Sequence, residues 1–310
     1  MRAAIRRSLI FFSDFTHGAG GKLVGVHYFG EENGLLPESR IVILPAPYDL
    51  SLSFLPGARL GPEAILAASV ELEPYDFELE LDAQSLGIHT AEPVPWVAGE
   101  AAKSHELIEE AASGYLGAGK FLIALGGDHS ISLPLVRAHL AHVDELGVLH
   151  VDAHDDLYDS WQGSRLSHAS VMRRIHELGL PLVQVGQRAV ARDSHAYIKE
   201  HGIPCFPASK IRRRGLPIDD ILRALPDRVY LSFDFDALDP SEMPAVGTPL
   251  AGGLSFGQVI DLLEAVFQEK DVIGLDFVEL SPIPGLFYPQ MTAAQLIYRA
   301  IGLKAVSAGW

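Results

Sequence analysis

Three short segments of the chain carry carboxylate and imidazole side chains that could lie together. Asp152, His154 and Asp156 occupy every second position of one segment, Asp234 and Asp236 do so in another, and His129 lies in the third. In an extended chain, residues i, i+2 and i+4 point to one side, so the side chains of each segment converge. The candidate metal ligands, each a carboxylate or an imidazole, are His129, Asp152, His154, Asp156, Asp234 and Asp236.

The chemistry of these groups is that of a metal centre. Ionisable groups aimed at one point repel one another unless cations neutralise them. Four carboxylates and two imidazoles suit two divalent ions, and oxygen and nitrogen donors without sulfur favour Mn²⁺ over a structural Zn²⁺. Two metal ions roughly 3.5–4 Å apart can share a water molecule and lower its pKa, so that hydroxide forms at neutral pH. The predicted cofactor is two Mn²⁺.

The elements that must position these groups are short apolar runs separated by amphipathic stretches. Runs that are apolar on both faces and alternate with helices predict a parallel sheet covered on both sides, in one doubly wound α/β domain. Ligands of such folds bind beyond the carboxyl ends of the strands, which is where the acids and imidazoles fall. The predicted strands are 40–44, 121–125, 147–151, 182–185, 229–233 and 272–275. The predicted helices are 62–69, 98–115, 133–143, 168–178, 218–224, 256–268 and 292–301.

Composition limits the partners and the location of the chain. There are 24 Lys and Arg against 40 Asp and Glu, so the net charge is −16, which argues against nucleic acids and anionic membranes as partners. The 48% hydrophobic content excludes a disordered acidic chain, and no apolar run reaches the roughly 20 residues of a membrane span. A single cysteine excludes an intrachain disulfide. We expect a cytoplasmic protein with an N-terminal extension at 1–35 and a catalytic domain at 36–310.

The three motifs, taken together, resemble the ureohydrolase family, which includes arginase and agmatinase. They read Gly-Gly-Asp-His-Ser at 126–130, Asp-Ala-His-Asp-Asp at 152–156 and Ser-Phe-Asp-Phe-Asp-Ala-Leu-Asp-Pro at 232–240, and the resemblance spans about 41–303. It implies a three-layer α/β/α domain with a mainly parallel eight-stranded sheet. It also implies that the chain forms a homo-oligomer, either a trimer or a hexamer.

The same resemblance implies how the two manganese ions are held. Asp152 and Asp234 would bridge both ions. The first ion would take His129, Asp152, Asp156 and Asp234, and the second would take Asp152, His154, Asp234 and Asp236. Asp128 matches a position that does not bind metal and is expected to support the site. Asp155 points away from its neighbours in the extended segment, so it is not expected to be a ligand.

Two further residues match family positions that act on the substrate. Glu279, in Leu-Asp-Phe-Val-Glu-Leu, matches the carboxylate that holds the guanidinium group, and His168, in Ser-His-Ala-Ser, matches the histidine proposed as a proton shuttle. Under this resemblance hydroxide attacks the guanidinium carbon, Asp156 helps to stabilise the tetrahedral intermediate, and His168 gives a proton to the departing amine. The alternative interpretation of His168 is an ordinary residue at the start of a helix.

The loop after the second motif bears on the substrate. It has no Asn between residues 157 and 165 and departs from the arginase pattern, whereas segments 45–49 and 55–62 look like the agmatinase branch. That branch includes enzymes that act on aminopropyl-extended agmatine in thermophile polyamine synthesis. Asp159, with Tyr158 and Trp161, could favour an amine-bearing tail by charge and cation–π contact, although an ordinary surface loop is an equal alternative. We expect agmatine or N1-aminopropylagmatine as a small cationic guanidino substrate, with urea and putrescine or spermidine as products.

Other functions remain open on the same site. Arginase, guanidinobutyrase and formiminoglutamase activities are alternatives. A basic residue at the pocket mouth would favour guanidinobutyrase or formiminoglutamase, whose substrates carry a carboxylate, and Arg165 is the nearest candidate in the sequence. A non-catalytic, metal-binding member of the family is an alternative of another class. Such proteins typically lose metal ligands, whereas all six candidates are present here.

Overall fold

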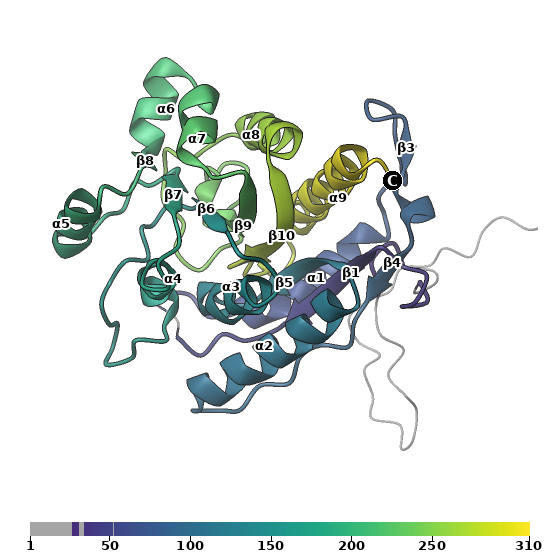
Figure 1. Ribbon diagram of the computed structural model, residues 1–310, viewed down its shortest axis with the longest axis horizontal. Helices are drawn as coiled ribbons and strands as arrows, with labels where there is room; N and C mark the ends of the chain where they lie inside the picture. Colours follow the sequence, from purple (N-terminus) through teal and green to yellow (C-terminus); the bar gives the residue numbers. More distant parts are fainter. Residues whose placement is uncertain (1–26, 31–33, 52) are drawn as a thin grey trace, which may run out of the picture.

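The computed structural model describes residues 27–30, 34–51 and 53–310, and its centre is one eight-stranded sheet (Figure 1). Every pairing in this sheet is parallel, in the order β4-β1-β5-β10-β9-β6-β7-β8. The strands are β1 (Ile41–Ala46), β4 (Ile88–Thr90), β5 (Phe121–Gly126), β6 (Gly147–Val151), β7 (Leu182–Val185), β8 (Cys205–Phe206), β9 (Arg228–Asp234) and β10 (Asp271–Val278). A small antiparallel hairpin joins β2 (Tyr75–Asp76) to β3 (Leu81–Asp82).

Strand side chains alternate between two apolar cores, one on each face of the sheet. In β1, Ile41 and Ile43 belong to the first core, whereas Val42 and Leu44 belong to the second. The first core also takes residues from α1 (Gly61–Ser69), α6 (Ala208–Arg214), α7 (Ile218–Ala224), α8 (Phe256–Glu269) and α9 (Tyr288–Ala308). The second takes residues from α2 (Ala101–Gly117), α3 (Ser132–Leu140), α4 (Val171–His176) and α5 (Arg192–His201). This burial on both faces explains why the strands are apolar throughout, and it confirms the predicted three-layer α/β domain (Figure 1).

The elements that the sequence pattern missed are those with little burial. All six predicted strands are present, but β4 and β8 were not predicted because edge strands of three and two residues show no periodicity. Helix α5 was missed because only Ser194, Tyr197 and Ile198 of its ten residues are buried. Helix α6 was missed as well, and it buries only Ala208 and Ile211. Helix α9 begins four residues earlier and ends seven residues later than the range 292–301.

The described part of the N-terminal region packs against the domain. Tyr28 and Phe29 are buried in the first core, and the Tyr28 hydroxyl donates to the Ala294 carbonyl oxygen at 2.8 Å. The predicted boundary between residues 35 and 36 stays a prediction, and most of the predicted extension lies outside the described residues. Among the described residues, no helix combines the length and the apolar character needed to cross a bilayer.

Candidate functional site

Four neighbouring strands in the middle of the sheet bring the motif segments together at one edge. Strands β5, β10, β9 and β6 are adjacent and parallel, so their carboxyl ends meet. His129 lies just after β5, Asp152 follows β6, Asp234 ends β9, and Glu279 follows β10. The sheet order therefore unites residues that are as much as 150 positions apart in the chain, as in the contact between His129 and Glu279.

The imidazole ring of His129 lies among three carboxylates. Its Nδ1 is 3.1 Å from Asp152 Oδ2, 3.3 Å from Asp156 Oδ2 and 3.1 Å from Asp234 Oδ2. All four side chains are buried. The structure thus brings together the four residues that are expected to bind the first metal ion.

Hydrogen bonds behind His129 decide which ring nitrogen faces these carboxylates. His129 Nε2 is 2.8 Å from Ser232 Oγ, and Ser232 donates its own hydrogen to Asp276 Oδ1 at 2.8 Å. Ser232 must therefore accept from His129, and we assign the ring hydrogen to Nε2. The neutral ring then presents the Nδ1 lone pair to three carboxylates. That arrangement is repulsive unless the ring takes a second proton or a cation lies between them, so the geometry fits a metal ligand.

A second group shares the carboxylate of Asp152. His154 Nδ1 is 3.5 Å from Asp152 Oδ1 and 2.9 Å from Asp236 Oδ2. Asp152 Oδ2 faces His129, so the two oxygens of one carboxylate face two different groups, as a bridging ligand would. Two groups of residues each bring their potential ligand atoms within 4.8 Å of one another. The first group is His129, His150, Asp152 and Asp156, and the second is Asp152, His154 and Asp236.

His150 is a member of this cluster that the motifs did not single out. Its Nε2 is 2.8 Å from Asp152 Oδ2, and its Nδ1 is 3.1 Å from the amide nitrogen of Gln184. Because the amide nitrogen only donates, His150 accepts at Nδ1 and donates from Nε2 to Asp152. His150 therefore holds Asp152 in place and has no free lone pair for a metal ion. The signal was available, since His150 lies in β6 two residues before Asp152, and side chains at i and i+2 of an extended segment point to the same side.

Burial and mutual repulsion govern the ionisation of the cluster. Burial, followed by repulsion from Asp152, raises the pKa of Asp156 well above the usual aspartate range. Burial and neighbouring carboxylates raise the pKa of Asp234 in the same way. Burial also opposes the charge on Asp152, but its attraction to His150 and other imidazoles outweighs burial and holds its pKa well below the usual range. Divalent cations would relieve this repulsion, and carboxylate and imidazole donors without sulfur fit such ions.

Glu279 reaches the same point from β10. Its Oε1 accepts the backbone N–H of His129 at 2.9 Å, and its own N–H donates to the carbonyl oxygen of Gly127 at 2.8 Å. Burial, followed by repulsion from Asp128, raises the pKa of Glu279 to about 8. Glu279 (φ 68°) and Asp156 (φ 50°) both adopt the left-handed backbone region, which is uncommon outside glycine and typical of functional sites.

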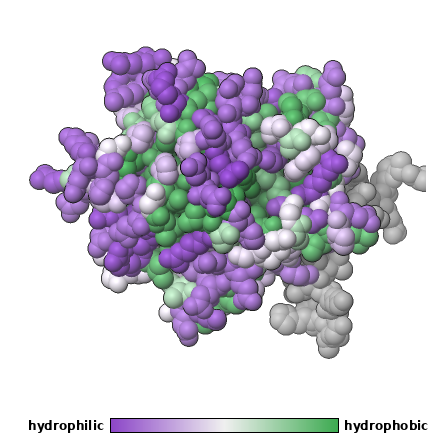
Figure 2. All heavy atoms as spheres, viewed as in Figure 1, coloured by the Kyte–Doolittle hydropathy of each residue, from purple (hydrophilic) through white to green (hydrophobic). Residues whose placement is uncertain are grey.

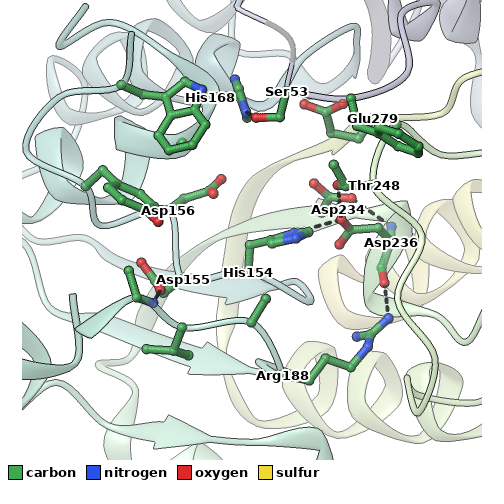
Figure 3. A pocket seen from close by; sticks show the side chains of 18 of the residues that line it. Ser53, His154, Asp155, Asp156, His168, Arg188, Asp234, Asp236, Thr248 and Glu279 are labelled. Carbon is green, nitrogen blue, oxygen red and sulfur yellow. Dashed lines mark hydrogen bonds and ion pairs between the residues drawn. The ribbon is translucent and has the colours of Figure 1, made fainter. Parts of the chain in front are cut away.

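A pocket of about 550 Å³ opens onto these groups (Figure 3). Figure 3 shows His168, Ser53 and Glu279 along one side of it, facing His154 and the carboxylates of Asp234 and Asp236. The remaining wall is largely apolar and aromatic, and includes Phe54, Leu55, Tyr158, Trp161, Ala189, Val190 and Ala191. The Tyr158 and Trp161 rings are 5.0 Å apart, so two of the three expected tail contacts line the pocket.

Asp159 is the exception among the expected substrate contacts. It is absent from the pocket lining, and its Oδ1 pairs with Arg174 at 3.0 Å and with Arg165 at 3.5 Å. Its negative charge is therefore already paired with two guanidinium groups, and the structure does not place Asp159 where it could contact a substrate tail. Arg165, the candidate partner for a substrate carboxylate, also pairs with Glu177 at 3.1 Å and is likewise outside the lining.

Arg188 is the one arginine or lysine among the described residues that line the pocket. Its guanidinium donates to backbone carbonyl oxygens, at 2.6 Å to Asp236, 2.8 Å to Leu250 and 3.1 Å to Leu238. These bonds tie two parts of the connection between β9 and α8 to each other. The cation is thus committed to the backbone, so the described lining offers no free positive charge to a substrate carboxylate.

The two expected non-ligands are held by hydrogen bonds of their own. Asp155 accepts the backbone N–H of Leu157 at 2.8 Å and that of Ala191 at 3.2 Å. Asp128 is fully buried and accepts from Ser51 and Ser130. Neither aspartate belongs to a set of converging ligand atoms in the described part of the chain.

A parallel sheet covered by helices on both faces, with a buried carboxylate–imidazole cluster at its carboxyl edge, is typical of metal-binding α/β proteins. Residues 39–302 match the sequence model of the arginase family. The N(1)-aminopropylagmatine ureohydrolase of Thermus thermophilus is 62% identical over 282 residues, which cover 91% of this chain and 96% of that relative. The agmatinase of Bacillus anthracis is 34% identical over 250 residues, covering 79% and 85% of the two chains. A solved structure, a hypothetical agmatinase from Burkholderia thailandensis, has a TM-score of 0.83 at 28% identity and covers 92% of each chain.

The chain belongs to the arginase family. The resemblance to ureohydrolases that the motifs indicated is confirmed, and the chain is a hydrolase of that family.

Proposed function

We propose that the chain hydrolyses N1-aminopropylagmatine or agmatine to urea and spermidine or putrescine, as a step of polyamine biosynthesis. The observation that carries this proposal is the pocket, which joins Glu279 and the carboxylate–imidazole cluster to an apolar and aromatic wall whose described residues offer no free cation. The names of the relatives that are 62% and 34% identical support the same substrates.

The cluster is proposed to hold two Mn²⁺. His129, Asp152, Asp156 and Asp234 would hold the first ion, and Asp152, His154, Asp234 and Asp236 would hold the second. When bound, such a pair of ions lowers the pKa of a water molecule, so that hydroxide is available near neutral pH. Asp152 contributes one oxygen to each side, which supports its role as a bridge.

Glu279 is proposed to orient the guanidinium group. A guanidinium presents paired N–H donors that match the two oxygens of a carboxylate. The pKa of Glu279 is raised to about 8 without a cation beside it, mainly by burial, and a guanidinium in the pocket would lower it again. Asp156 would accept a hydrogen bond from an amino group of the substrate as its carbon becomes tetrahedral.

His168 is proposed to deliver the proton that the departing amine needs. The reaction takes a guanidinium cation and one water molecule to urea and an alkylammonium ion, so both hydrogens of the water end on the products. The C–N bond to the tail nitrogen breaks, and that nitrogen must gain a proton as it leaves. His168 lines the pocket across from His154, and this position supports a role for its ring in the transfer (Figure 3).

The pocket wall supports a polyamine tail over an amino-acid tail. Exposed Phe54, Leu55 and Val190 offer apolar contact to methylene groups, and the Tyr158–Trp161 pair offers ring faces to an ammonium group. A substrate carboxylate would meet no free cation in the described lining, because Arg188 is bound to carbonyl oxygens. No contact in the described pocket favours arginine, guanidinobutyrate or formiminoglutamate.

The test is product release by the purified protein from five compounds, with added Mn²⁺ and after chelation. Urea is measured for N1-aminopropylagmatine, agmatine, arginine and guanidinobutyrate, and formamide is measured for formiminoglutamate. We expect turnover only with metal ions, and kcat/KM highest for N1-aminopropylagmatine or agmatine. A preference for a carboxylate-bearing compound would overturn the substrate assignment, and no turnover in a protein shown to hold two metal ions would favour the non-catalytic alternative.

Asp234→Asn checks the metal assignment in the same assay. We expect it to lose metal stoichiometry by elemental analysis and to lose at least about tenfold in activity, as weakened metal ligation does. An Asp234→Asn protein that binds metal ions and turns over like the parent protein would contradict the two-ion site. Asp271→Asn, at the exposed first residue of β10, is a matched control for the loss of one carboxylate.

The remaining proposals concern the assembly and the location of the chain. A homo-oligomer, trimeric or hexameric, is proposed from the family resemblance, and a cytoplasmic location is proposed from the composition of the chain. Mass photometry of the purified protein measures the first directly, and a monomer at micromolar concentration would contradict it.

A further inference from the structure

Asp128 is a buried carboxylate that joins two loops of the pocket. Its Oδ2 accepts the backbone N–H of Ser51 at 3.1 Å and the hydroxyl of Ser51 at 2.9 Å. Its Oδ1 accepts the backbone N–H of Ser130 at 3.0 Å and the hydroxyl of Ser130 at 2.5 Å. Asp128 is fully buried, and all four donors come from these two serines. The Ser51 hydroxyl therefore has its one hydrogen committed to Asp128.

Ser51 also contacts His168, from a third loop. Its Oγ accepts the backbone N–H of His168 at 2.9 Å and lies 3.2 Å from His168 Nδ1. An oxygen whose hydrogen is already donated can only accept, so the hydrogen between Ser51 and the ring must belong to Nδ1. The neutral ring of His168 is therefore the Nδ1–H tautomer.

The other ring nitrogen of His168 faces the pocket. Its Nε2 is 2.6 Å from the hydroxyl oxygen of Ser53, which also lines the pocket (Figure 3). With Nδ1 protonated, Nε2 carries the lone pair and Ser53 donates to it. The hydroxyl of Ser53 thus occupies the position at which a polar hydrogen of the substrate would meet Nε2.

We propose that Ser51, held by Asp128, is a positioning residue that fixes the tautomer and orientation of His168 and so presents Nε2 to the substrate. This rests on the proposed function in one respect, namely that His168 exchanges a proton with the departing amine. When Nε2 takes up a proton, the Nδ1–H bond to Ser51 is kept, and the carboxylate of Asp128 lies one hydroxyl away from the new positive charge. Asp128 and Ser51 thereby orient His168 as the buried carboxylate of a catalytic triad orients its histidine.

The first test reads the tautomer directly and needs no activity. Two-bond ¹H–¹⁵N correlation spectra of the full chain with ¹⁵N-labelled histidine are recorded in Mg²⁺, which is diamagnetic, and the His168 signals are assigned by their loss in His168→Asn. We expect a protonated Nδ1 and an unprotonated Nε2 in the wild-type protein, and loss of this preference in Ser51→Ala. A wild-type ring protonated at Nε2 would overturn the proposal, even if Ser51→Ala did not fold.

The second test separates positioning from general stability. We expect kcat of Ser51→Ala to fall by about tenfold to a hundredfold, the usual effect of removing a group that orients a catalytic residue, while KM and metal content change less than about twofold. Ser51→Thr keeps the hydroxyl and should recover most of the loss. Ser241→Ala is the matched control, because Ser241 donates its backbone N–H and its hydroxyl to Asp239 on the exposed surface in the same way.

The outcomes of the two tests distinguish this proposal from the proposed function. Unchanged kcat and an unchanged tautomer in Ser51→Ala would overturn the positioning role. An equal loss in Ser51→Ala and Ser51→Thr would overturn it as well, because the hydroxyl would then not be the cause. If the wild-type protein released urea from none of the guanidino compounds, the proposed function would fail, whereas the tautomer of His168 would still decide the role of Ser51.

Discussion

Glu279 lies where the guanidinium group is proposed to bind, and its raised pKa favours the neutral form of its carboxyl group at neutral pH. Glu279 follows a buried strand, adopts a left-handed backbone conformation and accepts the backbone N–H of His129. Burial and the nearby Asp128 together raise its pKa to about 8, above the ordinary value of 4.5. At the residue scale, the protein therefore carries a carboxylate whose charge is unfavourable in the fold and favourable only beside a cation.

This pKa predicts the pH dependence of stability in the metal-free protein. Between the ordinary pKa of about 4.5 and the folded pKa of about 8, the folded state binds more protons than the unfolded state, so the free energy of unfolding falls as pH rises. Glu279→Gln removes this titration but keeps an oxygen that accepts from His129. We expect the variant to be as stable as wild type near pH 4.5 and more stable by a few kcal/mol at pH 8, at about 1.4 kcal/mol for each pH unit.

Urea denaturation of the chelated proteins at pH 5 and pH 8 measures this difference. Glu106→Gln, on an exposed position of α2, controls for the loss of one charge. Equal pH dependence of wild type and Glu279→Gln would show that burial does not raise the pKa of Glu279. The same variant is expected to lose turnover, because a neutral amide lacks the negative charge and the second acceptor oxygen that pair with a guanidinium ion.

At the scale of the elements, the loops after β1 and β5 are packed backbone against backbone. Gly127 donates its N–H to the Ala46 carbonyl oxygen at 3.1 Å, and Asp128 donates its own to that of Tyr48 at 2.7 Å. A Cβ on Gly127 would lie 2.0 Å from the carbonyl oxygen of Tyr48, and the next nearest atoms also belong to the Tyr48 backbone. Glycine is needed here for a close approach of two chains rather than for an unusual backbone angle.

Gly127→Ala is therefore expected to force the two loops apart. Overpacking of this kind costs typically about 1–3 kcal/mol, and more where only backbone can move. Since His129 and Ser51 lie on these loops, affinity for metal ions should fall as well. Gly114→Ala is the control, because Gly114 lies within α2 and no atom of the described residues lies within 4 Å of a new Cβ there. Alanine at this position should stabilise the protein by about 0.5–1 kcal/mol. Thermal unfolding that is unchanged in Gly127→Ala would contradict the close packing.

At the scale of the whole molecule, the acidic charge and the site act together. The net charge is −16, and Figure 2 shows hydrophilic side chains spread over the face it presents, with apolar side chains between them. Two divalent ions would bring four positive charges to the cluster, leaving −16 + 4 = −12 on the remainder of the chain. A molecule of this charge attracts cationic substrates from a distance and repels anionic ones.

This field predicts how the rate depends on salt. We expect kcat/KM for agmatine and N1-aminopropylagmatine to fall as ionic strength rises through about 0.1 M, where the Debye length is about 10 Å. The decrease should be steeper for N1-aminopropylagmatine, which carries one more ammonium group. Initial rates at low substrate concentration, with chloride as the only variable, measure this. A rate constant that does not change with salt for either substrate would show that the overall charge has no part in substrate capture.

The sequence by itself determined the features that depend on local spacing. Alternation placed Asp152, His154 and Asp156 on one side of the chain, and apolar runs identified the six longest strands of the sheet, because burial on both faces leaves a continuous pattern. Edge strands β4 and β8, by contrast, are too short to show a period. The family motifs then identified Glu279 and His168 as residues that line one pocket.

Only the tertiary structure decided which partners these residues meet. Asp159 is paired with Arg174, His150 is held by Gln184 from β7, and Ser51 joins Asp128 to His168 across three loops. Each of these contacts joins segments that are separated by 15 to 117 residues. A local pattern carries no information about such pairs, because the order of the strands in the sheet and the packing of the loops bring them together.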